Sequence, residues 1–279
     1  MRLSCFLASI LIIFFIHSTA YSEKLKLNID STIRFVDDPR ILLRFSGAKE
    51  LEDVKFGVIS VSELLPSSIR NSFQFGVMKG DKKLYVGNIF GTDNIISVVP
   101  KHSLNNGMQK KLATYSDSYN PVQFTFSDKI TDKLIYSVTY VPITSISDSL
   151  GVKISLIGGL KYKGNVKNTS FTTYAIGGCM ADYASYELGG SLSYLGVTLS
   201  MCIGKSPVPQ DIYMIIGLQY EIGAVSLEVA NIISNEHRNS ATISYKISKG
   251  FSIYSTFMHS YDTHHSNMLA FGVKKDFFT

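Results

Sequence analysis

The sequence of 279 residues contains no tryptophan, only three cysteines and seven prolines, and only 18% charged residues. The small number of cysteines excludes a domain held together by several disulfides. The low charge and the positive mean hydropathy of +0.14 exclude a disordered chain. After residue 22, no apolar run approaches the roughly 20 residues that a spanning helix needs. The chain is therefore predicted to fold without spanning helices or a disulfide framework.

The N-terminus has the pattern of a secretory signal peptide. Arg2 precedes an apolar run over residues 6–16, and small residues follow in 17–22. Cleavage after Ala20 or Ser22 fits the pattern, and Ser22 is favoured, which gives a signal peptide over 1–22 and a mature domain over 23–279. Only Arg2 is charged among the removed residues, so the formal net charge falls from +5 to +4. The alternative is a membrane anchor, for which the run is too short.

The composition of the mature chain indicates a large apolar surface. The full sequence holds 16 tyrosines and 17 phenylalanines, and 45% of it is hydrophobic. An exported chain this apolar, without a spanning helix, needs an apolar environment for that surface. A soluble β-sandwich could bury part of it, but a membrane barrel fits better, because such barrels are apolar outside, polar inside and ringed by aromatic residues.

Alternation of apolar and polar residues runs through most of the mature chain. Apolar residues hold the odd positions of 25–35 and charged or polar residues the even ones, which gives a strand with two different faces. The same period recurs in 41–45, 69–77, 122–126, 134–140, 152–156, 212–220, 225–229, 241–247 and 269–273. No stretch shows helical spacing. Turn-forming residues separate the strands, at 37–39, 79–81, 90–93, 206–209 and 248–250.

These patterns predict an all-β fold, a transmembrane antiparallel β-barrel. At roughly 16 residues for each strand and its connection, the mature chain gives about 16 strands, with about 14 or 18 still acceptable. Closure into a barrel pairs every backbone N–H and C=O group within the bilayer.

Three segments resemble the general porins of Gram-negative bacteria. Residues 83–92 (KLYVGNIFGT) resemble the segment that leads into the third loop of porins. Residues 114–119 (TYSDSY) and 136–142 (YSVTYVP) resemble the paired strands that follow the loop. Residues 245–254 (YKISKGFSIY) and 271–278 (FGVKKDFF) resemble the closing hairpin. The resemblance implies an outer-membrane channel for small hydrophilic solutes, a homotrimer, and a third loop that folds into the lumen as an acidic constriction.

The sequence also departs from this family. Thr279 follows the terminal aromatic Phe278, and the Gly-Arg expected after the Phe-Gly-Thr segment is absent. The candidate third loop, about residues 92–109, is shorter than the family norm and carries one acid, Asp93. The constriction is therefore expected to be wider, differently charged or missing.

The strand pattern places a mainly basic set of side chains in the lumen. If odd positions of 25–35 face lipid, even positions there and at 40, 44 and 274 face inward, and the third loop, if it folds inward, adds its own charges. Rings of basic side chains favour anions, so we expect a mild anion preference; the alternative is that the charges only keep the interior hydrated. The expected pore-lining residues are Arg34, Arg40, Arg44, Asp93, Lys101, His102 and Lys274.

Other functions have weaker support in the sequence. His264 and Ser266 resemble the His-x-Ser-Asn element of outer-membrane lipid hydrolases, but only Asp276 could act as the third catalytic member. The histidines of 259–265 lack metal-site spacing, so no metal is expected. No phosphate-binding loop or basic-aromatic stripe appears, so neither a cofactor nor a nucleic-acid partner is expected. A non-conducting barrel that serves as a surface antigen or adhesin remains a further alternative.

The two cysteines of the mature chain, Cys179 and Cys202, could form a disulfide in an oxidising periplasm. Two separate thiols on different strands are an equally good interpretation, and the sequence leaves both open.

Overall fold

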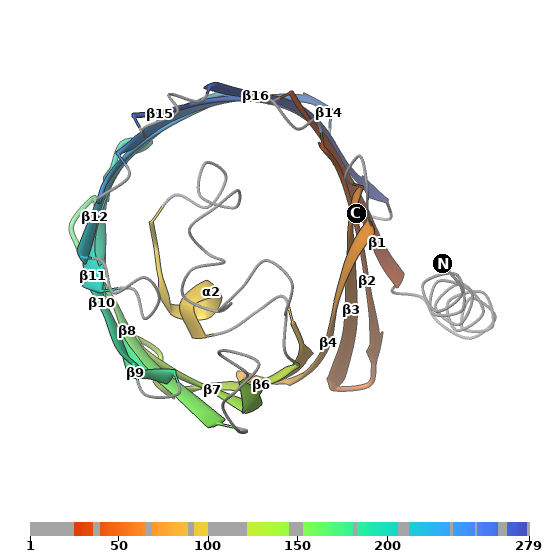
Figure 1. The fold of residues 1–279 in the computed structure, drawn as a ribbon, viewed down its shortest axis with the longest axis vertical. Coiled ribbons are helices and arrows are strands. Elements are labelled where there is room, and N and C mark those ends of the chain that lie inside the picture. Colours follow the sequence, from red (N-terminus) through yellow and green to blue (C-terminus); the bar gives the residue numbers. More distant parts are fainter. Residues whose placement is uncertain are drawn as a thin grey trace.

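The chain forms a closed antiparallel barrel that encloses a short helix (Figure 1). This is a computed structural model, and it describes residues 25–35, 40–64, 69–88, 92–99, 122–144, 153–180, 183–205, 212–234, 237–248, 250–261 and 267–277. The signal-peptide prediction for 1–22 lies outside these residues. No helix in the described ranges is long and apolar enough to cross a bilayer.

Sixteen strands and one helix are present in the described part of the chain. The strand number agrees with the prediction. A single helical turn also forms at Thr92–Ile96, a stretch too short to show helical spacing in the sequence. The elements in chain order are β1 (Leu25–Phe35), β2 (Arg40–Leu51), β3 (Val54–Leu64), β4 (Ile69–Lys79), β5 (Lys82–Gly87), α2 (Thr92–Ile96), β6 (Gln123–Thr131), β7 (Leu134–Thr144), β8 (Lys153–Val166), β9 (Thr169–Met180), β10 (Tyr183–Tyr194), β11 (Val197–Lys205), β12 (Ile212–Ile222), β13 (Val225–Ile233), β14 (Arg238–Ser248), β15 (Phe251–Ser260) and β16 (Asn267–Phe277).

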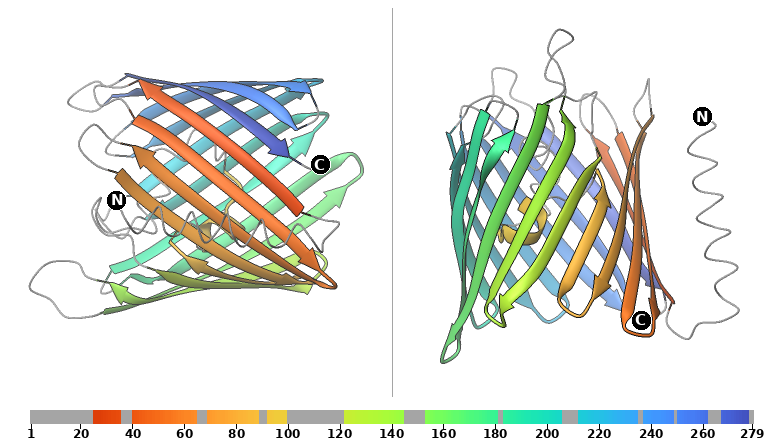
Figure 2. Two further views of the ribbon diagram at one scale, coloured as in Figure 1. Left: turned by 90° about the vertical axis from the view of Figure 1, so that its right-hand side faces the viewer. Right: turned by 90° about the horizontal axis from the view of Figure 1, so that it is seen from below.

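Each strand pairs with its neighbours in sequence, and the first strand pairs with the last. The closing ladder between β1 and β16 runs from Leu27 opposite Phe277 to Phe35 opposite Leu269. Closure leaves no free strand edge, which is the condition for a β structure to stand in lipid. The strands are tilted relative to the barrel axis, as Figure 2 shows from two sides.

Tight turns gather at one end of the barrel, which we call the turn end. Each even-numbered strand up to β14 passes to the next strand there through a very short connection. Several of these turns need a left-handed backbone: Gly223 has a φ of 56°, and Leu195 and Gly196 have φ values of 48° and 82°. Such two-residue turns match the natural twist of paired strands. The turns predicted at 79–81 and 248–250 both lie at this end.

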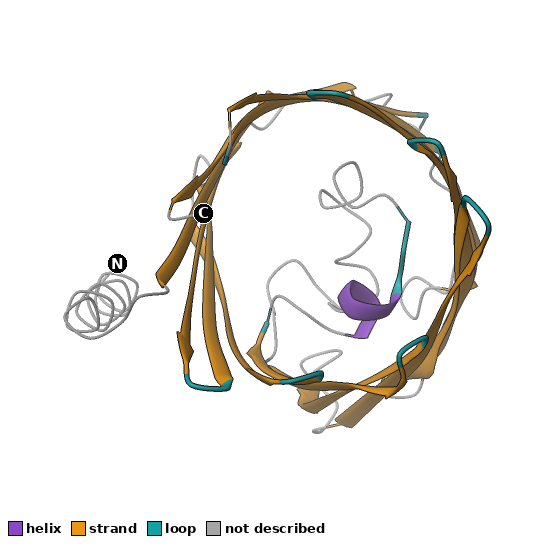
Figure 3. Cartoon of the chain, turned by 180° about the vertical axis from the view of Figure 1, so that it is seen from behind, coloured by secondary structure: helices purple, strands orange, loops and turns teal. Residues whose placement is uncertain are grey.

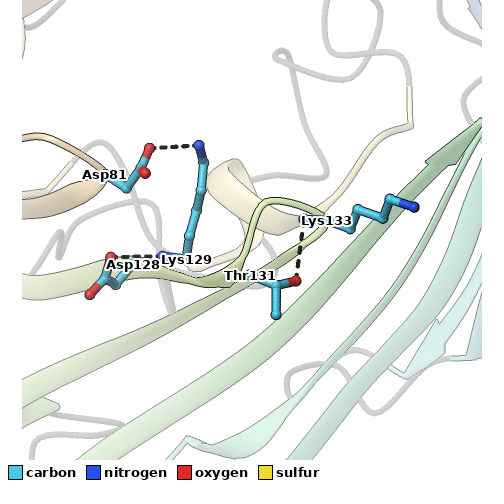
Figure 4. Close-up of polar contacts among 5 residues, drawn as sticks. All are labelled: Asp81, Asp128, Lys129, Thr131 and Lys133. Carbon is cyan, nitrogen blue, oxygen red and sulfur yellow. Dashed lines mark hydrogen bonds and ion pairs between the residues drawn. The ribbon is translucent and has the colours of Figure 1, made fainter.

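The turn between β6 and β7 shows how side chains stabilise this end (Figure 4). The Thr131 hydroxyl accepts hydrogen bonds from the backbone N–H groups of Lys133, at 3.3 Å, and Leu134, at 3.1 Å. Lys129 Nζ lies 2.7 Å from Asp81 Oδ1 in the neighbouring β4–β5 turn. Both groups are exposed, so the ion pair contributes little to stability.

Candidate functional site: the lumen and its inward segment

The side chains of each strand alternate between the lumen and the outside. On β6, Gln123, Thr125 and Ser127 are buried, whereas Phe124 and Phe126 are exposed. Thr125 bonds to Thr139 of β7, which in turn contacts the enclosed helix, so the polar set faces inward. The phenylalanines therefore face outward.

The same polarity continues around the barrel. Outward columns are apolar and exposed, as with Leu199, Met201 and Ile203 on β11. Inward positions include many buried hydroxyls. A water-soluble protein shows the opposite arrangement, with large apolar side chains inside. A mainly apolar exterior around a mainly polar interior, as the described side chains show, is the arrangement of a barrel that stands in lipid. The outward apolar runs predicted from the sequence are confirmed wherever their side chains are described.

The inward segment comprises α2 and the residues up to Val99. It lies within the ring of strands and against one side of it, as Figures 1 and 3 show. The helix contacts β6, β7, β8 and β9. The expectation that the connection after β5 folds inward thus holds for Thr92–Val99; the remainder of the 92–109 loop, with Lys101 and His102, lies outside the described residues.

A cluster of hydroxyl groups fixes the start of the inward segment. The Thr92 backbone N–H donates to Thr139 Oγ1 at 2.7 Å, and the two side-chain hydroxyls lie 2.9 Å apart. The Thr92 hydroxyl also lies 3.3 Å from Ser137 Oγ and 3.3 Å from the Ile157 carbonyl oxygen. Thr92, Thr125, Ser137 and Thr139 are all almost completely buried. Buried hydroxyls with this many partners hold the backbone of Thr92 in one position.

Apolar packing holds the rest of the segment. Ile96 and Val99 are buried against an apolar patch on the lumen side of the barrel wall, with Ile95 and Val98 packed at its edge. This patch lies on the inner face where the segment covers it. The wall residues of the cluster are Ile157, Tyr174, Ile176, Cys202, Tyr213, Ile215 and Ile232, with Ile135 at its edge.

A buried carboxylate lies beneath the inward segment. Glu187 of β10 is 2% exposed and accepts hydrogen bonds from Tyr174 OH, at 2.5 Å, and from Tyr213 OH, at 2.6 Å. Ser97 donates to the Tyr174 hydroxyl at 3.1 Å, which links this network to the inward segment. A second link runs from Lys161 Nζ to the Ile95 carbonyl oxygen. The segment is therefore attached to the wall at Thr92, Ile95 and Ser97.

Lysines gather near the turn end on the inward-facing positions of six strands. Side chains alternate between the two faces of a strand, so these lysines face the lumen where the outward positions of their strands are apolar. Lys246, for example, follows Tyr245 and precedes Ile247, and both of these neighbours are exposed on the outside. Lys55 lies 3.8 Å from Glu50, and Lys129 pairs with Asp81 (Figure 4). Lys83, Lys163, Lys246 and Lys274 make no ion pair with any acidic side chain that the structure describes. The set, which we call the lumen lysines, is Lys55, Lys83, Lys129, Lys163, Lys246 and Lys274.

The predicted cationic wall is partly placed by the strand register. Arg34 lies opposite Arg40 on β2 and Ala270 on β16. Asp30 lies between Arg44 and Lys274 in one row of Cα partners. The first and last strands thus bring these positions together, as expected, with an acid between two bases. The side chains of Arg34, Arg40, Arg44 and Asp93 lie outside the described part of the structure; Asp93 itself is in α2.

Sequence reasoning missed the residues that hold the inward segment. Tyr213 and Ile215 were hidden because residues 212–216 (IYMII) are apolar on both faces, and only one face was assigned. A strand that is apolar on both faces within an alternating barrel is the signal that something packs on its inner side. Lys83, Lys163 and Lys246 also went unassigned, although each occupies the polar phase of its strand.

The described residues do not show a catalytic, metal or disulfide site at the positions that the sequence offered as alternatives. His264 and Ser266 lie outside them. Within the described ranges no three potential metal ligands cluster. Cys179 and Cys202 are both free thiols; Cys179 is exposed and Cys202 is buried in the cluster under the inward segment.

The fold and lumen define the class of structure: a closed sixteen-stranded barrel with an inward segment. Solved structures of the Rhodopseudomonas blastica porin have a similar fold. A variant with five substitutions is 12% identical and matches with a TM-score of 0.62, covering 91% of this chain and 99% of that one. A triple mutant of the same porin gives the same values. A third match, described as an engineered protein of asymmetric conductivity, is 10% identical with a TM-score of 0.62.

This likeness establishes the fold, and it confirms the porin resemblance at that level. No protein-family model matches the chain. No curated protein matches its sequence either.

Proposed function

We propose that the mature chain is an outer-membrane channel through which small hydrophilic solutes diffuse, with a mild preference for anions. The observation that carries the proposal is the inverted polarity of the closed barrel, whose apolar exterior surrounds a lumen of hydroxyls and lysines. The exterior requires lipid, and the interior requires water. The turn end faces the periplasm in this proposal, because barrels of this kind have short periplasmic turns.

The anion preference rests on the charge of the lumen. The lumen lysines give the wall near the turn end an excess of positive charge, and the arginines proposed at positions 34, 40 and 44 add to the positive charge of the inner wall farther from that end. Such charges attract anions and repel cations within a confined channel. Residues 1–22 are proposed to be the cleaved signal peptide, and the resemblance to porins extends the proposal to a homotrimer. No cofactor and no catalytic step is part of it.

Single-channel recording tests the proposal. The mature protein is refolded and inserted into a planar bilayer with potassium chloride at different concentrations in the two chambers. We expect stepwise current and a reversal potential of the sign that anion permeation produces. A reversal potential of the opposite sign would contradict the proposed anion preference. A folded barrel that never conducts would contradict the channel itself and favour a surface antigen or a membrane-bound enzyme.

A further inference from the structure

We propose that Lys246, Ser252 and Lys274 form a binding site for anions that carry two or more phosphate groups, at the turn end of the lumen. The inference rests on the proposed channel and names a class of solute that it would hold. The three residues lie in one row across neighbouring strands: Lys246 of β14 is the Cα partner of Ser252 of β15, and Ser252 is the partner of Lys274 of β16.

The row faces the lumen. Partners in an antiparallel pair share a face. Lys246 lies on the same face of β14 as Thr242, which is buried and bonded to Thr256 inside the barrel. Lys274 lies on the same face of β16 as the buried Ala270, whereas Phe271 and Val273 are exposed on the outer face. Neighbouring strands are about 4.8 Å apart, so the two lysine Cα atoms are separated by about 10 Å. Flexible four-carbon stems let both ammonium groups reach one ligand between them.

The charge of the row suits a multivalent anion. Lys274 is exposed, Lys246 is exposed, and neither is paired with a described acidic side chain. Lys55 and Lys129 differ in this respect, because Glu50 and Asp81 already neutralise them. Two ammonium groups and one hydroxyl offer donors for phosphate oxygens, and the attraction grows with the charge on the ligand. A diphosphate should therefore bind far better than chloride.

Two acids limit the strength of the site. Asp30 of β1 is the Cα partner of Lys274 on the side away from Ser252. Glu221 of β12 also lies near the turn end, where its carboxylate accepts a hydrogen bond from Gln219 Nε2 at 2.8 Å. We expect Asp30→Asn to strengthen binding, because it removes a negative charge from the next position of the row.

Titration with inorganic pyrophosphate tests the site. The refolded barrel is titrated by calorimetry and, in a bilayer, its chloride current is recorded as pyrophosphate is added at constant ionic strength. The double variant K246Q/K274Q is compared with K133Q/K167N, which removes the same charge from two exposed turn lysines. Circular dichroism and heat-dependent mobility on a gel confirm that each variant folds.

We expect pyrophosphate to bind the native barrel and reduce its current, with the midpoint raised about tenfold in K246Q/K274Q and unchanged in K133Q/K167N. Equal midpoints in the two double variants would overturn the site, as would a native barrel that conducts chloride but neither binds nor is blocked by pyrophosphate. A barrel that binds pyrophosphate but never conducts would leave the site in place and contradict the channel.

Discussion

Tyr213 and Glu187 are joined across an intervening strand: the Tyr213 hydroxyl on β12 donates to Glu187 Oε2 on β10 at 2.6 Å, and β11 lies between them. The β11 residue beneath the link is small, because Gly204 is the Cα partner of both Glu187 and Tyr213. A Cβ at Gly204 would lie 2.5 Å from the Tyr213 hydroxyl oxygen. The glycine therefore makes room for the tyrosine ring, and the ring fixes a carboxylate under the inward segment.

The first prediction concerns this link. Tyr213→Phe removes one of the two donors to a buried carboxylate and should lower the free energy of unfolding by about 1–3 kcal/mol. The measurement is urea unfolding of the barrel refolded in lipid vesicles. Tyr220→Phe is the matched control, because Tyr220 on the same strand is outward and exposed. Equal losses of stability in the two variants would show that Glu187 does not depend on Tyr213.

The second prediction concerns the attachment of the inward segment. Thr92→Val keeps the side-chain shape but removes the hydroxyl that contacts Thr139, Ser137 and the Ile157 carbonyl group. We expect the segment to detach intermittently, which would appear as added noise and larger conductance levels in single-channel records. Thr173→Val, on the exposed outer side of β9, serves as control. Quiet records identical to those of the native protein would argue that the apolar cluster alone holds the segment.

The third prediction concerns the position of the barrel in the bilayer. Successive rows across β13–β16 change from apolar to polar: Val229, Ala241, Phe257 and Leu269 form one row, and Asn231, Asn239, His259 and Asn267 form the next. Hydrogen bonds join Asn231 to Asn239, at 2.7 Å, and His259 to Asn267, at 2.6 Å. The polar row is therefore expected to lie closer to the lipid headgroups.

Single tryptophans report this depth directly, because the chain has none of its own. Lipids brominated on their acyl chains should quench the fluorescence of Phe257→Trp strongly and that of Asn267→Trp weakly. The reverse order would mean that the apolar rows are not the lipid-facing belt in this part of the barrel.

The fourth prediction concerns charge selectivity. Lys163→Glu combined with Lys246→Glu changes the lumen charge by four units, and the reversal potential under a salt gradient should move toward that of a cation channel. The combination K133E/K167E introduces the same charge in exposed turns outside the lumen and should move it much less. If both pairs shift the potential equally, selectivity is set by the overall charge of the mouth and not by the inner wall.

Much of the barrel could be predicted from alternation, although not equally in every strand. The strands at 122–126, 134–140 and 212–220 were visible because their outward positions carry large apolar side chains. β9 was not recognised, since its outward positions include Thr173, Ala175 and Gly177, which are too small and weakly apolar to mark a lipid face. Pairing with β8 and β10 defines this strand, and such pairing is not local in sequence.

The site was predicted less completely than the fold. The inward course of the segment after β5 was expected from a resemblance, but its partners lie 45 to 77 residues away, as with Thr92 and Ser137 or Ser97 and Tyr174. No local pattern in the sequence marks Glu187, because the two tyrosines that bind it come from different strands. Contacts between residues this distant depend on the closed register of the barrel, and alternation alone does not specify that register.

Single-channel current from the refolded mature protein in a planar bilayer, under a potassium chloride gradient, tests the central claim most directly. The account predicts stepwise conductance with a reversal potential on the anion side, and additional fluctuation when Thr92 is replaced by valine. A barrel that is folded and membrane-inserted, as judged by the tryptophan reporters, yet passes no current in any record would contradict it.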